Sequence, residues 1–171
     1  QGSASFVDGS SVVVSAADGS ETKLSAKHFI IATGSVPAAI PPAPVDNKTI
    51  VDSTGALAFT AVPKTLGVIG AGVIGLELGS VWRRLGAQVV IREALPDLLP
   101  GADPALAKEA KKVLSRQGLD IRLGASVTKA SVQGKQVDVE FELAGKAETL
   151  KVDKLIVAVG RKPNSAGLAA E

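Results

Sequence analysis

The glycine-spaced segment Gly70–Gly75 constrains the fold of this chain more than any other stretch. It reads Gly-Ala-Gly-Val-Ile-Gly, with glycines at its first, third and sixth positions. An apolar run, Leu66–Ile69, comes directly before it, and apolar residues at helical spacing follow it as far as Leu85. A second apolar run, Gln88–Ile91, comes after Gly86, a residue typical of a helix end. The order strand, glycine turn, helix, strand predicts a βαβ unit with two parallel strands.

The three glycines have separate steric roles in such a turn, and together they predict a site for a dinucleotide. Gly70 permits the tight turn, Gly72 lets the backbone approach a pyrophosphate, and Gly75 lets the helix and strand pack closely. The helix that opens with Val73 and Ile74 is expected to point free N–H groups and its positive dipole end at phosphate oxygens. We therefore expect these five residues to bind the cofactor, chiefly through backbone atoms.

Glu93 follows the second strand at the spacing expected of an acid that binds ribose hydroxyls. A carboxylate accepts hydrogen bonds from the ribose 2′-hydroxyl and repels the 2′-phosphate of NADP, so NAD is the expected cofactor. Arg92 leaves NADP open as an alternative, because its guanidinium could pair with that phosphate. Strand alternation turns Arg92 to the face opposite Glu93, where we expect a solvated side chain at the strand end.

The N-terminal part of the chain predicts a small antiparallel meander. Its strand-like runs, Ala4–Val7, Val12–Ser15 and His28–Ile31, are punctuated by Asp-Gly pairs that favour tight turns. A Pro-rich stretch follows at residues 37–44, where fixed φ angles and missing amide donors disfavour both helix and central strand. We expect the chain to cross between domains there.

The C-terminal half predicts one more helix and a second set of strands. Asp103 as N-cap and Pro104 at the first helical position begin a helix that ends at Gly118. The strand-like runs that follow are Leu119–Leu123, Ser126–Val132, Gln136–Leu143, Glu148–Val152 and Leu155–Val159. The expected fold class is α/β: a Rossmann-like three-layer domain with a parallel sheet and a β-meander, together with flanking β segments.

The composition excludes several classes of function. The chain has no Cys and one His, so disulfides, thiolate metal sites and cysteine nucleophiles are excluded and no metal site is expected. The net charge of +2 is scattered, which predicts no nucleic-acid surface. No apolar run approaches the roughly 18 residues of a membrane span, and no membrane partner is expected. Because the chain begins at Gln1 in strand-like alternation, we expect a piece of a longer protein.

Three motifs occur in a fixed order along the chain. They are Leu24–Ser35, which ends in Ala-Thr-Gly-Ser, then Gly67–Trp82 around the glycine turn, and Val157–Asn164 with Gly-Arg-Lys-Pro-Asn. Together they resemble the dihydrolipoamide dehydrogenase family of flavoprotein disulfide oxidoreductases over essentially the whole chain. The resemblance implies a homodimer in which FAD, a cysteine pair and NAD pass electrons from dihydrolipoamide to NAD⁺, within 2-oxo acid dehydrogenase and glycine cleavage complexes.

The resemblance also implies a division into domains. Residues 46–152 correspond to the NAD-binding domain, and residues 1–45 and 153–171 correspond to remnants of an FAD domain. The resemblance places further residues near the cofactors: Thr33, Gly34 and Arg161 at FAD, Val127 at the adenine side of NAD, Gly160 at the nicotinamide side, and Glu77 near the flavin, where it would pair with a lysine that this chain lacks.

The departures from the family pattern concern catalysis. The FAD-binding glycine motif, the cysteine pair and the C-terminal His and Glu pair are all missing, so this chain alone is expected to be catalytically incompetent. Two alternatives are an NADP-using reductase of the same superfamily, such as glutathione or mercuric reductase, and a stand-alone nucleotide-binding module without enzyme activity. Glu93, with Gly75 and Gly79 in place of alanines, argues against the first. The expected compartment is the bacterial cytoplasm, or the mitochondrial matrix in a eukaryote.

Overall fold

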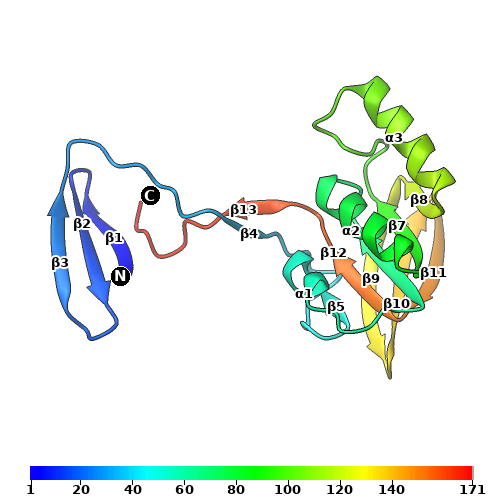
Figure 1. The fold of residues 1–171 in the computed structure, drawn as a ribbon, viewed down its shortest axis with the longest axis horizontal. Coiled ribbons are helices and arrows are strands. Elements are labelled where there is room, and N and C mark those ends of the chain that lie inside the picture. The colour runs from blue at the N-terminus through cyan, green and yellow to red at the C-terminus, as the bar shows by residue number, and fades with distance from the viewer. Residues whose placement is uncertain (171) are drawn as a thin grey trace. The chain divides into compact units, whose positions relative to one another are not determined.

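The structure is a computed structural model that describes residues 1–170, and these form two compact units. Residues 37–160 form one unit, and residues 1–36 with the C-terminal segment from Arg161 form the other (Figure 1). No helix in the described part of the chain is long and apolar enough to cross a membrane. Each unit is described by itself below.

The larger unit is built on a five-stranded parallel sheet. The strands, in their spatial order, are β5 (Ile50–Val51), β12 (Lys154–Val157), β6 (Thr65–Ile69), β7 (Gln88–Glu93) and β8 (Leu119–Leu123). The predicted βαβ unit is confirmed, because β6 and β7 pair in parallel and α2 (Val73–Arg84) connects them. The two-residue strand β5 was not predicted.

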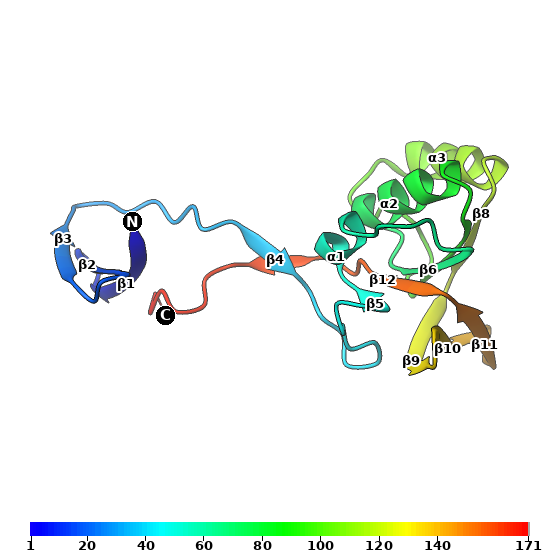
Figure 2. The same cartoon turned by 60° about the horizontal axis from the view of Figure 1, so that its bottom comes forward.

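Three helices cover one face of the parallel sheet (Figure 2). They are α1 (Ser53–Leu57), α2 and α3 (Pro104–Arg116). The helix α3 begins as predicted, with Asp103 accepting from the amides of Ala105 and Leu106. Against the sheet, Gly79 of α2 lies so close to Ile91 that a Cβ atom would come within 3.2 Å of its Cδ1. This small position lets α2 lie near the strands.

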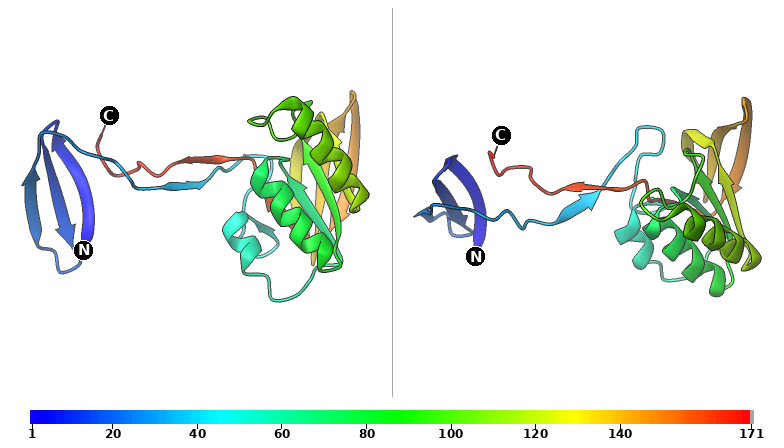
Figure 3. Two further views of the ribbon diagram at one scale, coloured as in Figure 1. Left: turned by 45° about the horizontal axis from the view of Figure 1, so that its top comes forward. Right: turned by 90° about the horizontal axis from the view of Figure 1, so that it is seen from above.

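An antiparallel meander covers the other face of the parallel sheet (Figures 2 and 3). Its strands are β9 (Ala125–Gln133), β10 (Gln136–Leu143) and β11 (Lys146–Val152). One apolar cluster lies between the helices and the sheet, with Leu66, Ile91 and Trp82 among its members, and a second lies between the sheet and the meander. The predicted three-layer α/β fold is confirmed.

The smaller unit contains a meander of β1 (Gly2–Asp8), β2 (Ser11–Ala16) and β3 (Glu21–Ser25). The first two predicted runs are confirmed, but the predicted strand His28–Ile31 is wrong, because those residues form no strand. Ile30 is 94% exposed and has no neighbouring strand among the described residues, and an extended segment without such a partner makes no ladder of hydrogen bonds. The remaining short strands pair with each other: β4 (Ser35–Pro37) and β13 (Arg161–Pro163).

Candidate nucleotide-binding site

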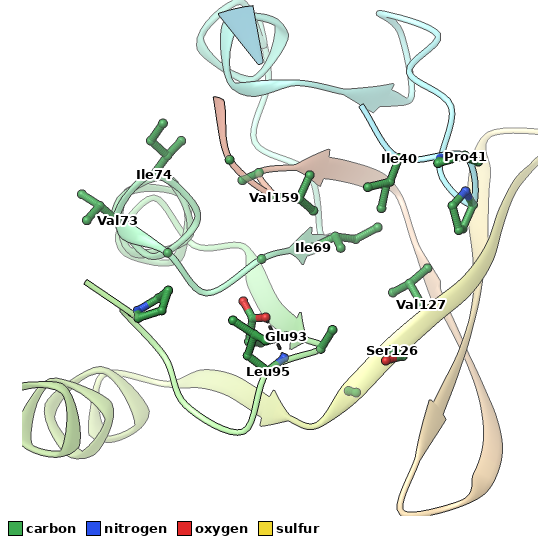
Figure 4. Close-up of a pocket in the computed structure, with 18 residues that line it drawn as sticks. Ile40, Pro41, Ile69, Val73, Ile74, Glu93, Leu95, Ser126, Val127 and Val159 are labelled. Atoms are coloured by element: carbon green, nitrogen blue, oxygen red, sulfur yellow. Dashed lines mark hydrogen bonds between the residues drawn. The ribbon is translucent and has the colours of Figure 1, made fainter. Parts of the chain in front are cut away.

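A cavity of about 640 Å³ lies in the larger unit, where β6, β7 and β12 end (Figure 4). In open α/β sheets, ligands bind in the crevice outside the carboxyl ends of the parallel strands. The lining residues are Ile40, Pro41, Pro42, Ile69, Gly70, Gly72, Val73, Ile74, Glu93, Ala94, Leu95, Pro100, Ala125, Ser126, Val127, Ala158, Val159 and Gly160. The wall is mostly apolar, and among the described residues that form it Glu93 alone is charged.

The glycine turn between β6 and α2 requires glycine at two positions for different reasons. Gly70 has a φ of 105°, and a Cβ atom there would lie 2.4 Å from the carbonyl oxygen of Ala158. At Gly75, a Cβ atom would lie 2.1 Å from the carbonyl oxygen of Gly70. Gly70 therefore shapes the turn beside β12, and Gly75 is buried beneath the turn rather than in the cavity wall.

Gly72 is the N-cap of α2, and its surroundings differ from those of the other two glycines. Apart from Gly72 and its neighbours along the chain, no atom of the described residues lies within 4 Å of the place where its Cβ would be, so the backbone is open to the cavity there. Gly72 offers no side-chain hydrogen bond to the first turn of α2, which begins with Val73 and Ile74. The first N–H groups of a helix need acceptors from outside the helix, and an anion can supply them.

The carboxylate of Glu93 is fixed against the glycine turn. Its Oε2 accepts a hydrogen bond from the amide of Ala71 at 2.6 Å. Its Oε1 accepts one from the amide of Leu95 at 2.9 Å (Figure 4). An ionised carboxylate has about four acceptor positions, so the two that these amides leave can accept from a ligand. The arrangement offers a rigid acceptor for hydroxyl groups next to a loop suited to phosphate.

Arg92 lies on the opposite face of β7, as strand alternation predicts, but the prediction that it is solvated is wrong. The residue is 8% exposed and lies between the parallel sheet and the meander. Its Nη1 and Nη2 atoms donate to Oδ2 of Asp120 at 3.4 Å, and its Cζ lies 4.8 Å from the ring centroid of Phe141. Phe141 belongs to the meander, which covers this face of β7 and excludes water from it.

Two other predicted residues line the same cavity. Val127 extends from β9, and Gly160 follows β12. Sequence reasoning missed the part of the wall formed by Ile40, Pro41 and Pro42. The Pro-rich composition of that stretch indicated only a crossover, and a segment without regular periodicity gives no signal of which side chains face a ligand.

Besides Gly75, four predicted residues do not line this cavity. Glu77 is exposed on α2 and is not part of the wall. Thr33, Gly34 and Arg161 belong to the smaller unit. There, Nε of Arg161 donates to Oγ of Ser35 at 2.7 Å, and Nη2 of Arg161 donates to the carbonyl oxygen of Ser35. These contacts link β4 and β13.

Comparison with curated proteins relates the chain to dihydrolipoyl dehydrogenases. It is 52% identical to dihydrolipoyl dehydrogenase 3 of Pseudomonas putida over 94% of this chain and 35% of that protein. It is 42% identical to the dihydrolipoamide dehydrogenase of Chaetomium thermophilum over 100% of this chain and 34% of that protein. The chain therefore spans about a third of the length of these relatives.

Comparison with solved structures gives relatives of the same architecture. The structure of LpdA from Mycobacterium tuberculosis matches with a TM-score of 0.85 and 25% identity, over 98% of this chain and 37% of that one. The flavoprotein disulfide reductase RclA from Escherichia coli matches with a TM-score of 0.77 and 35% identity over the same shares. The family model described as pyridine nucleotide-disulphide oxidoreductase matches residues 2–171. With its glycine turn, its parallel sheet and these relatives, the chain belongs to the pyridine nucleotide-disulphide oxidoreductase family.

Proposed function

We propose that the larger unit binds NAD(H) in the cavity at the ends of β6, β7 and β12. The observation that carries the proposal is the junction of Glu93 with the glycine turn, where the carboxylate is hydrogen-bonded to the amide of Ala71. The pyrophosphate would lie against Gly72 and the first turn of α2, whose amides have no side-chain cap. The adenosine would lie between Glu93 and Val127, and the nicotinamide would point towards Gly160. Val73 and Ile74 would form the rim of the phosphate site, and Gly70 and Gly75 would shape the loop.

The preference for NAD over NADP is part of the same proposal. The carboxylate of Glu93 suits a ribose diol and repels a 2′-phosphate. None of the residues that line the cavity is basic, and Arg92 is turned into the opposite layer with its guanidinium against Asp120 and Phe141. The alternative that Arg92 binds a 2′-phosphate therefore has no support in the position of this side chain.

For the whole protein we propose the dehydrogenase activity for which its relatives are named, the oxidation of dihydrolipoamide. We propose NAD⁺ as the electron acceptor. Residues 46–152 would form the NAD-binding domain, and residues 1–45 and 153–171 would belong to an FAD domain. The family resemblance also supports a homodimer within 2-oxo acid dehydrogenase complexes, in the bacterial cytoplasm or the mitochondrial matrix. A dihydrolipoyl dehydrogenase of Schizosaccharomyces pombe that is 41% identical to this chain is named as mitochondrial.

The flavin chemistry would need protein beyond these 171 residues. FAD supplies the two-electron relay between a dithiol and NAD⁺, and this chain has no cysteine to supply the dithiol. Thr33, Gly34 and Arg161 are the residues proposed to lie at FAD, with Glu77 near the flavin. The chain by itself is therefore proposed to bind nucleotide without catalysing the reaction.

Calorimetric titration of the 171-residue chain with NADH and with NADPH tests the proposal. We expect saturable binding of NADH and at least tenfold weaker binding of NADPH, about 1.4 kcal/mol. In Glu93→Ala the affinity for NADH should fall by about 10- to 100-fold, because hydrogen bonds to a charged group contribute about 1.5–3 kcal/mol. The preference for NADH should disappear with it.

The matched control is Glu142→Ala, which removes an exposed carboxylate on β10 that does not line the cavity. Its NADH affinity should equal that of the wild type. If the wild-type chain is folded and binds neither dinucleotide, the proposal is overturned. If NADPH binds more tightly than NADH, the proposed preference for NAD is overturned.

A further inference from the structure

Arg92 is a buried cation at the junction of the two sheets of the larger unit. It is 8% exposed, and its Nε has no hydrogen-bond partner among the described residues. Nη1 donates to the carbonyl oxygen of Ile91 at 3.1 Å and, with Nη2, to Asp120 of β8. Burial lowers the pKa of Arg92, while the charge and hydrogen bonds of Asp120 oppose that decrease. The guanidinium thus stays charged in a poorly solvated layer.

An apolar side chain could fill this layer without the desolvation cost of a charge. Arginine differs in its reach and its planar fork, which let one side chain contact two sheets at once. The guanidinium bonds Asp120 in the parallel sheet, and its Cζ lies 4.8 Å from the ring centroid of Phe141 in the meander. The Arg92 side chain therefore connects β10 of the meander to β7 and β8 of the parallel sheet.

The contact between Arg92 and Phe141 is linked to both walls of the adenosine end of the cavity. Glu93 follows Arg92 directly in β7, and its carboxylate lies in the cavity wall. Phe141 is the cross-strand partner of Val127, at the point where the register between β9 and β10 shifts. Directly opposed residues of an antiparallel pair project on the same face of the sheet, so a displacement of Phe141 carries Val127 with it.

We propose that Arg92 is a positioning residue that fixes the spacing between Glu93 and Val127, and so the width of the adenosine end of the cavity. The proposal rests on the NAD(H) site proposed above. Without the arginine, the meander is free to shift relative to β7, and the cavity tolerates a larger adenine. Selectivity for the unmodified adenine ring is the property that Arg92 confers.

The test compares NAD⁺ with its 1,N⁶-ethenoadenine derivative, which carries an extra fused ring on the adenine. Both are titrated into the full chain by calorimetry, with wild type, Arg92→Met, Arg92→Lys and Asp120→Asn. The wild type should bind the etheno derivative more weakly than NAD⁺. The ratio of the two Kd values should move towards unity by about tenfold in Arg92→Met, the low end of the selectivity that one methylene of fit provides.

The two other variants separate the parts of the contact. Arg92→Lys keeps the charge but loses the planar fork, so its ratio of the two Kd values should also move towards unity. Asp120→Asn keeps the stacking on Phe141 and weakens the ion pair, so its shift should be smaller. The matched control is Lys151→Met, which removes an exposed meander cation paired with Asp138 and should leave the ratio unchanged. Urea unfolding of each variant measures how much of it is folded in the titrations. A loss of folded protein would lower the apparent affinities for both dinucleotides equally, so it cannot change the ratio of the two Kd values.

Each outcome decides between the two proposals. A wild-type chain that binds neither dinucleotide overturns the proposed function and this inference with it. A wild type that binds NAD⁺, with the same Kd ratio in Arg92→Met and Asp120→Asn, overturns this inference alone. If Arg92→Met does not fold, the ratio in Asp120→Asn decides.

Discussion

Gly72 and Gly75 lie three residues apart, Gly72 as the N-cap of α2 and Gly75 within that helix. Their surroundings differ, so we expect their mutation to affect stability differently. At Gly75 an added methyl group meets the backbone of Gly70, which cannot move without breaking the turn. We expect Gly75→Ala to lower the free energy of unfolding by about 3 kcal/mol, as strong overpacking does. At Gly72 the φ of −76° suits any residue, and an added Cβ would have no atom within 4 Å other than those of its neighbours along the chain. Gly72→Ala should therefore change stability by only about 0.5 kcal/mol.

NADH binding should be impaired in Gly72→Ala even though the stability of this variant is nearly unchanged. Gly72→Ala stays folded but places a methyl group where the pyrophosphate would approach the backbone, so its NADH affinity should fall at least about tenfold. Urea denaturation measures the stability of both variants, and calorimetry measures binding in the folded one. A Gly72→Ala chain that binds NADH as tightly as the wild type would show that the phosphate does not lie against this residue.

Arg92 marks the limit of what sequence could predict about single residues. Period-two alternation correctly placed its side chain opposite Glu93, because that depends on the strand alone. Its burial depends on the meander, whose strands lie more than thirty residues further along the chain. Local pattern carries no information on which layer covers a strand, so the predicted solvated arginine was wrong. Seven of the 18 residues that line the candidate cavity were predicted. The motif gave the turn, the helix start and the acid, the family resemblance gave Val127 and Gly160, and the loop residues that complete the wall carry no local signal.

At the scale of the elements, the carboxylate of Asp153 joins the starts of three strands, a role that was not predicted from the sequence. Oδ2 of Asp153 accepts from the amide of Thr65 at 2.9 Å, and Oδ1 accepts from the side chain of Gln136 at 3.0 Å. The amide of Asp153 in turn donates to Oγ1 of Thr65. This group therefore joins the starts of β6, β10 and β12. The hydrogen bonds from Gln136 and Thr65 hold the pKa of Asp153 below its ordinary value.

A lowered pKa in the folded state makes the contribution of Asp153 dependent on pH. The ionised group stabilises the fold above the unfolded-state pKa of about 4, and the contribution is lost as the pH falls from there through the lower folded-state pKa. Asp153→Asn should cost about 1 kcal/mol at pH 7, since the site is partly solvated, and less as the pH falls below about 4. Urea denaturation at pH 7, 4.5 and 3 measures this. Asp97→Asn, in an exposed loop, is the control; an equal cost of Asp153→Asn at all three pH values would contradict the prediction.

The predictability of an element followed its length and its partners. The helices α2 and α3 have clear apolar periodicity and end signals, so their bounds were predicted closely. The five-residue helix α1 and the two-residue strand β5 are too short for a periodic pattern, and tertiary contacts stabilise them. Residues 28–31 have the composition of a strand, but composition alone does not supply the neighbour that a strand requires.

At the scale of the whole molecule, the two apolar clusters lie entirely within residues 37–160. The cavity does so as well, since its lining residues run from Ile40 to Gly160. A chain of residues 37–160 should therefore fold cooperatively and bind NADH with a Kd within about twofold of that of the full chain, a difference of about 0.4 kcal/mol. Removing the smaller unit removes neither a layer of the three-layer fold nor a wall of the cavity. Thermal unfolding and calorimetric titration of both chains check this, and a shortened chain that folds but binds at least tenfold more weakly would show that the smaller unit contributes to the nucleotide site.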